Sequence, residues 1–385
     1  MISPEPVSSA SLSQGPPQLG LTDRYLPVWI IAAMGAGLLL AAFLPAVGDA
    51  LHAFSIGSVS VPIAIGLLVM MYPVLAKVRY SDARTIAGDK RLLVSSLLLN
   101  WVLGPALMFA LAWIFLPDLP EYRTGLIIVG LARCIAMVLI WNDLACGDRE
   151  AAAFLVAVNS VFQVIAFGAL GWFYLQVLPA WLGLPTTSAD FSFWAITASV
   201  LVFLGIPLLA GYLSRRIGEA RRGRTWYEAT FLPKVGPFAL YGLLFTIVML
   251  FALQGRQVID APFDVARIAL PMLVYFGVMF LLGFAVGKIA GLAYERSTTL
   301  AFTAAGNNFE LAIAVAIGTF GATSGQALAG IVGPLIEVPA LVALVYVALW
   351  LRPRLFPTTP ASTPTPASTP TPASTPTPAR QRTTP

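Results

Sequence analysis

Charged residues are scarce in this 385-residue chain. Asp, Glu, Lys and Arg together make up 11% of the residues, whereas hydrophobic residues reach 58% and the mean hydropathy is +0.82. An average soluble domain is about one-quarter charged. The composition therefore excludes an ordinary water-soluble fold and predicts an all-α, multi-pass integral membrane protein.

Histidine and cysteine are also rare. The chain has one histidine, His52, and two cysteines, Cys134 and Cys146, which are twelve positions apart. This set makes neither a disulfide framework nor a zinc-type cluster, and we expect both cysteines to be reduced. The sequence also lacks a Walker motif, a Ser/His/Asp set and a basic face with interleaved aromatic residues. We therefore expect no cofactor, no structural metal, no enzymatic activity and no nucleic-acid partner.

Ten runs of about 20 apolar residues are long enough to cross a bilayer as helices. They are 25–45, 60–77, 92–116, 124–142, 150–175, 193–213, 232–254, 268–290, 298–319 and 326–351. Lys and Arg accumulate in cytosolic loops, and a cytosolic N-terminus places 19 of the 23 basic residues inside and three outside. We therefore expect both termini to be cytosolic, and the compact loops suggest a bacterial inner membrane.

The two ends of the chain differ from its apolar middle. Residues 1–24 are polar and rich in Ser and Pro, without the pattern of a signal peptide. At the other end, Ala-Ser-Thr-Pro-Thr-Pro occurs three times in succession between Ala361 and Pro378. Such segments cannot bury a core. We expect a disordered cytosolic arm over 1–24, a transmembrane domain over 25–352 and a disordered cytosolic tail over 353–385.

A weak internal repeat divides the transmembrane domain into residues 25–178 and 193–352. The matches are Pro62 with Pro237 at a spacing of 175, and Gly66 with Gly242, Gly130 with Gly306 and Cys134 with Glu310 at a spacing of 176. Each unit holds five predicted spans, so the second copy enters the membrane from the opposite side. This inverted-repeat layout is typical of secondary transporters.

The fourth and ninth predicted spans are the least lipid-like. Each has a glycine near its midpoint with polar side chains beside it, which are Arg133 and Cys134 in one span and Asn307, Asn308 and Glu310 in the other. Interrupted backbone at membrane depth is tolerated only where it is buried in protein or lines a cavity. We therefore predict that the two interruptions face each other across a central substrate site.

Cys134 and Glu310 each allow two interpretations. A buried cysteine is often an inert apolar residue, but the neighbouring Arg133 would favour a thiolate, which is a soft ligand. Glu310 is either the static ion-pair partner of Arg133 or a carboxyl that loads and releases a proton. Glu337, which lies between two prolines in the tenth span, is the second candidate for proton coupling.

Five local patterns within residues 20–355 resemble those of arsenite efflux permeases of the bile acid/arsenite/riboflavin transporter superfamily. They are Gly66-Leu-Leu-Val-Met-Met-Tyr-Pro73, Asn100-Trp-Val-Leu-Gly-Pro-Ala-Leu-Met108, Gly130-Leu-Ala-Arg-Cys-Ile-Ala-Met-Val138, Asn307-Asn-Phe-Glu-Leu-Ala312 and Pro334-Leu-Ile-Glu-Val-Pro339. The resemblance implies ten helices in two inverted five-helix repeats, with helices 4 and 9 broken and crossing. It also implies export of trivalent arsenite, and for some members antimonite, by proton antiport, which confers arsenical resistance.

The family's essential cysteine falls on Cys134 and its essential glutamate on Glu310, so As(III) is expected to bind Cys134 as a substrate. Arg133, Asn307 and Asn308 complete the predicted substrate site, and Glu337 joins Glu310 in proton coupling. Two other functions stay open. A sodium-coupled organic-anion symporter of the same fold would use Arg133 as a counter-charge, and a membrane receptor or scaffold would act through its Pro-rich tail. The sequence does not indicate a separate ATPase partner or an oligomeric state.

Overall fold

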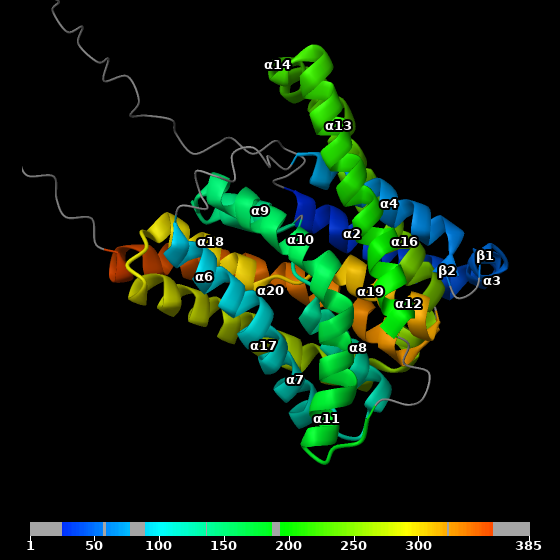
Figure 1. Cartoon of the computed structure of the whole chain (residues 1–385). Helices are drawn as coiled ribbons and strands as arrows, with labels where there is room; N and C mark the ends of the chain where they lie inside the picture. The colour runs from blue at the N-terminus through cyan, green and yellow to red at the C-terminus, as the bar shows by residue number, and fades with distance from the viewer. Residues whose placement is uncertain are drawn as a thin grey trace, which may run out of the picture.

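The computed structural model describes residues 25–56, 59–77, 89–135, 137–186, 193–321 and 323–356 (Figure 1). The predicted N-terminal arm, and the predicted tail from residue 357 onward, lie outside these residues. The first residues assigned to the tail are helical, because the last helix continues to Leu355.

The described part of the chain is helical, as its composition predicts. Its strands are the two-residue β1 (Ser55–Ile56) and β2 (Val59–Ser60), which form a small antiparallel hairpin. Six helices are long and apolar enough to cross a membrane, namely Lys90–Phe115, Arg149–Trp181, Phe193–Arg222, Arg224–Arg256, Pro262–Ile289 and Gly325–Leu355. Shorter apolar helices are Val28–Phe43, Val61–Ala76 and Phe309–Phe320.

The helices of the two halves of the chain are as follows. The first half contains α2 (Leu26–Phe43), α3 (Pro45–Ala53), α4 (Val61–Ala76), α6 (Lys90–Leu98), η1 (Leu99–Leu103), α7 (Gly104–Phe115), α8 (Pro120–Leu131), α9 (Met137–Leu144), α10 (Arg149–Trp172), η2 (Phe173–Val177) and α11 (Leu178–Trp181). The second half contains α12 (Phe193–Val200), η3 (Leu201–Gly205), α13 (Ile206–Arg222), α14 (Arg224–Trp226), η4 (Tyr227–Phe231), α15 (Leu232–Val235), α16 (Pro237–Asp260), α17 (Pro262–Ile289), α18 (Tyr294–Ala305), α19 (Phe309–Phe320) and α20 (Gly325–Leu355).

Four of the long helices contain a five-residue π-helical segment, η1 to η4. In each case the second residue after the segment is a proline: Pro105, Pro179, Pro207 and Pro233. Proline has no backbone N–H, and its ring clashes with the carbonyl four residues earlier. The wider π turn accommodates this defect, so the helix continues past the proline without a break.

The helices form two groups that meet at the functional site. In one group, α16 packs against α2 and α4, and α4 packs against α13. α4 and α16 cross closely at Gly242. A side chain at this position would lie 2.9 Å from the Met70 Cα atom and 3.0 Å from the Gly66 carbonyl oxygen. In the other group, α17 and α20 pack together and hold α18, α19, α7 and α8. Figure 1 shows α13 and α14 projecting from one end of the bundle.

Candidate functional site

Two helices are interrupted at the positions that the sequence predicts. α8 ends at Leu131, and Ala132 is extended (φ −88°, ψ 115°) before α9 begins at Met137. α18 ends at Ala305, and Gly306 is extended (φ −72°, ψ 142°) before α19 begins at Phe309. The glycine and the polar residues of each span therefore mark a true break in the helix.

The two breaks pair with each other as a short antiparallel crossing. The Cys134 backbone N–H donates to the Gly306 carbonyl at 3.3 Å, and the Asn308 N–H donates to the Ala132 carbonyl at 3.0 Å. Arg133 and Asn307 form an isolated antiparallel bridge between these bonds. Backbone groups that leave a helix must find other partners when they are buried. Here each break supplies partners for the other.

Two asparagine side chains also cap the broken ends. The Asn307 side-chain amide donates to the Val129 carbonyl at 2.8 Å and to the Ala132 carbonyl at 3.2 Å, where α8 ends. The Asn308 Oδ1 atom accepts from the Leu311 backbone N–H at 3.0 Å, so it caps the start of α19. Both predicted ligands therefore have a structural role as well.

A small closed cavity lies beside the crossing. Its lining comes from α4, from both breaks and from α20, namely Met70, Met71, Val74, Cys134, Ile135, Met137, Asn307, Asn308, Glu310 and Glu337. Its volume of about 10 Å³ is room for roughly one water molecule. The structure thus brings together five of the six predicted site residues, in a state that is closed to a larger ligand.

Several polar atoms around this cavity have unused hydrogen-bonding capacity. The Asn307 Oδ1, Asn308 Nδ2 and Glu337 Oε1 atoms are buried without a hydrogen-bond partner among the described residues. An unsatisfied buried polar group costs about 1–3 kcal/mol. The cavity is therefore suited to a ligand that offers both hydrogen-bond donors and acceptors.

Arg133 is the predicted site residue that the structure places elsewhere. Its guanidinium is fully buried. Nη1 donates to the Tyr275 hydroxyl at 2.7 Å and to the Ala304 carbonyl at 3.5 Å, and Nη2 donates to the Gly130 carbonyl. Among the described residues, no carboxylate pairs with it. Arg133 and Cys134 lie in an extended segment, where successive side chains point to opposite sides, so the guanidinium and the thiol face different ways.

The surroundings of Arg133 stabilise its buried positive charge. Gly130 belongs to the last turn of α8 and Ala304 to the last turn of α18, so the guanidinium binds the carbonyl ends of two half-helices. Helix C-termini carry partial negative charge, and a buried cation there is stabilising. Gly104 leaves room for this arrangement, because a side chain there would lie 2.9 Å from the Arg133 Nη1 atom.

The sequence did not single out several residues that complete the site. Tyr275 on α17 gave no signal among its apolar neighbours. The Gln163 side chain on α10 also reaches the break, where its Oε1 atom accepts from the Arg133 backbone N–H. Met70 and Met71 lie within one of the five patterns, and only the tertiary structure shows that they close the cavity. Neither Cys134 nor Cys146 forms a disulfide among the described residues.

A comparison with protein-family models shows the family to which this chain belongs. The model of the Sodium Bile acid symporter family matches residues 64–261, which is just over half of the chain. This chain belongs to the Sodium Bile acid symporter family. It is therefore a transmembrane transporter.

Two relatives of this chain are named arsenical-resistance proteins. The chain is 64% identical to the arsenical-resistance protein Acr3 of Corynebacterium glutamicum over 345 residues, which cover 90% of this chain and 93% of the relative. It is 31% identical to the arsenical-resistance protein Acr3 of Alkaliphilus metalliredigens, over 86% of this chain and 93% of the relative. It is also 36% identical to the uncharacterized transporter slr0944 of Synechocystis, over 85% and 88%. The resemblance to arsenical-resistance permeases is confirmed.

Proposed function

We propose that this family member exports trivalent arsenite, with antimonite as a second substrate, in exchange for protons, and that it thereby confers arsenical resistance. One observation carries the proposal. A single thiol, Cys134, and two carboxyls, Glu310 and Glu337, line the same closed cavity at the crossing of two broken helices. The names of the arsenical-resistance relatives support arsenite as the substrate.

The Cys134 thiol would bind arsenic reversibly. Arsenite at neutral pH is an uncharged trihydroxide, and As(III) exchanges oxygen for sulfur ligands. One As–S bond to Cys134 forms as one As–O bond breaks, and the departing hydroxide leaves as water with the thiol proton, without a change of oxidation state. The unpartnered Asn307 Oδ1 and Asn308 Nδ2 atoms would accept from and donate to the remaining As–OH groups. A single sulfur bond allows the substrate to leave again.

The closed cavity implies that the wall must move during transport. Room for about one water molecule is too little for arsenic with its hydroxyl groups. Met70, Met71 and Val74 on α4 form one wall, and the crossing forms the other. Separation of α4 from the crossing, on one side of the membrane at a time, would give alternating access to a fixed central site.

Glu310 and Glu337 would carry the exchanged proton. Both carboxyls line the cavity in which arsenite would bind. Protonation from outside would favour release of arsenite, and deprotonation toward the cytosol would reset the carrier. Arg133 would act as a positioning residue, because it fixes the break from which Cys134 reaches the cavity.

The ten-helix inverted repeat belongs to the same proposal. α4 begins at residue 61 and α16 at 237, and α10 begins at 149 and α20 at 325, so both pairs keep the 176-residue spacing. The packing follows the same correspondence. In the repeat, α13 corresponds to α2 and α16 to α4; α2 packs against α16, and α13 packs against α4. These correspondences support two five-helix units within residues 25–352. The excess of Lys and Arg in the predicted cytosolic loops supports a cytosolic position for both termini.

Transport by everted membrane vesicles tests the coupling. Vesicles with an acidic interior should accumulate arsenite when they contain the wild type, and Glu310→Gln should abolish the dependence on the pH gradient. An imposed sodium gradient should have no effect. Uptake of an organic anion driven by sodium would instead favour the symporter alternative. Against that alternative, none of the described residues that line the cavity is basic.

A further inference from the structure

The connection between α13 and α16 forms a projecting basic hairpin, residues 214–234, at one end of the bundle (Figure 1). α13 changes character along its length. Up to Leu213 it exposes apolar side chains such as Leu209 and Leu213, and from Ser214 onward it reads Ser-Arg-Arg-Ile-Gly-Glu-Ala-Arg-Arg. This change is typical of a helix that leaves the hydrocarbon core and enters the headgroup layer.

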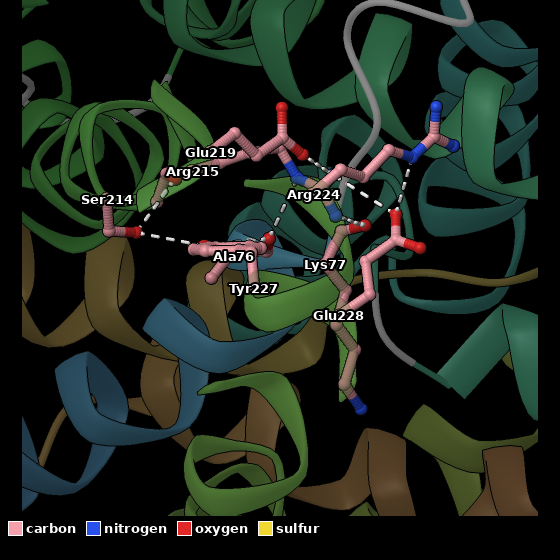
Figure 2. A network of polar contacts seen from close by, with 9 residues as sticks. Ala76, Lys77, Ser214, Arg215, Glu219, Arg224, Tyr227 and Glu228 are labelled. Atoms are coloured by element: carbon pink, nitrogen blue, oxygen red, sulfur yellow. Dashed lines mark hydrogen bonds and ion pairs between the residues drawn. The ribbon is translucent and has the colours of Figure 1, made fainter. Parts of the chain in front are cut away.

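The basic hairpin is held firmly against the end of α4. Figure 2 shows the buried Arg215 side chain, which donates to the Ala76 carbonyl at 3.4 Å and to the Lys77 carbonyl at 3.2 Å. The Tyr227 hydroxyl donates to the same Ala76 carbonyl at 3.3 Å and lies 3.2 Å from the Ser214 hydroxyl. These bonds satisfy the open carbonyls at the C-terminus of α4. The hairpin therefore presents a fixed surface.

The basic hairpin has an excess of positive charge. Its two acidic residues are already paired, Glu219 with Arg215 at 2.6 Å and Glu228 with Arg224 at 3.1 Å. The other four basic residues have no acidic partner among the described residues; they are Arg216, Arg221, Arg222 and Lys234. The surface is thus suited to an anion.

A groove of about 360 Å³ runs beside these charges. Its apolar lining includes Ile217, Trp226 and Phe231, and the exposed Arg221 and Arg222 also line it. The Arg222 guanidinium lies over the Trp226 ring at 4.7 Å, which holds it beside the groove. A glycine keeps the groove open, because a side chain at position 218 would meet the Tyr227 ring at 2.6 Å.

We propose that this groove binds an anionic phospholipid, with its phosphate on Arg221 and Arg222 and its glycerol and upper acyl chain on the apolar lining. Guanidinium groups bind phosphate oxygens through paired hydrogen bonds. The groove lies next to the exposed apolar stretch of α13. The phosphate of the lipid would therefore meet the two arginines, and its acyl chain would meet apolar side chains. This amphipathic match favours a lipid over a soluble acidic partner. The site is separate from the cavity at Cys134 and does not depend on what that cavity transports.

Native mass spectrometry of the full-length protein in detergent tests the site. With equal amounts of phosphatidylglycerol and phosphatidylcholine added, the wild type should retain phosphatidylglycerol preferentially. The double variant Arg221→Gln/Arg222→Gln should weaken its retention by roughly tenfold or more, given the contribution of each basic residue at an anionic lipid surface. Both side chains are exposed, so folding should be unaffected.

The double variant Arg216→Gln/Lys234→Gln is the matched control, because it also removes two exposed positive charges from the same hairpin but outside the groove. It should retain phosphatidylglycerol like the wild type. Equal retention of the two lipids by the wild type, or equal loss in the control Arg216→Gln/Lys234→Gln and in Arg221→Gln/Arg222→Gln, would overturn the proposal. An acidic soluble protein that binds the groove while phosphatidylglycerol does not would overturn it as well.

Discussion

The tight contact between the two helix breaks makes Gly306→Ala an informative perturbation. A methyl group at position 306 would lie 3.0 Å from the Cys134 Cβ atom, 3.3 Å from the Phe302 carbonyl oxygen and 3.6 Å from the Cys134 sulfur. The backbone of Gly306 has a negative φ that alanine adopts readily. The effect of the substitution is therefore steric alone, and Cys134 must give way by a few tenths of an ångström.

Cys134 cannot move alone, because its backbone N–H is bonded to the Gly306 carbonyl and the neighbouring Asn308 N–H to the Ala132 carbonyl. Overpacking of such a rigid contact costs about 1–3 kcal/mol. If that cost falls on the transport-competent state, transport should decrease by roughly 5- to 150-fold. Cys134 would keep its thiol, so the loss would report its position rather than its chemistry.

Thermal unfolding of the purified protein and arsenite uptake by everted vesicles measure the two effects together. Gly277→Ala on α17 is the matched control, because nothing lies within 4 Å of its added methyl group. In a helix interior that change should be neutral or stabilise by up to about 1 kcal/mol. Wild-type stability and transport in Gly306→Ala would refute the tight crossing, as would an equal loss in Gly277→Ala.

Three further predictions concern other parts of the chain. Arg133→Lys should lower the thermal unfolding temperature, since one ammonium cannot reach Tyr275 and both helix ends, and an unsatisfied carbonyl costs about 1–3 kcal/mol; unchanged stability with lost transport would instead mean direct contact with substrate. The hydrogen bond from Arg267 holds the pKa of Asp118 below its ordinary value of 3.8. The ionised Asp118 therefore stabilises the fold above pH 3.8, and this contribution is lost as the pH falls through the lowered pKa. Asp118→Asn should be slightly less stable than the wild type at neutral pH, and a difference that persists at the most acidic pH would contradict the assignment. Deletion of residues 357–385 should leave arsenite uptake intact at normal expression, because their composition cannot build a packed domain; lost uptake would favour the receptor or scaffold function.

The positions of the helix breaks could be predicted because their signal is local. A glycine with polar neighbours inside an apolar span is costly in lipid unless the backbone finds other partners. The structure confirms the breaks, with Cys134, Asn307, Asn308, Glu310 and Glu337 around one cavity. The four π-helical segments also have a local cause, because a proline follows each of them two residues later.

Other features depend on tertiary structure and could not be predicted. Arg133 and Cys134 are neighbours in sequence, but whether they point to the same side depends on the backbone conformation of the break. The extended conformation separates them and leaves Arg133 with Tyr275, a residue 142 positions away. In the same way, Met70 and Met71 close the cavity only because α4 crosses α16 at Gly66 and Gly242.

Arsenite accumulation by everted vesicles that contain the wild type or Cys134→Ser tests the central claim most directly. The proposed mechanism predicts accumulation by the wild type under an imposed proton gradient and its loss in Cys134→Ser, while the variant remains folded. Serine keeps the size of the side chain but not the soft sulfur ligand. Equal accumulation by both proteins, or none by well-expressed wild type, would contradict a thiol-dependent arsenite transporter.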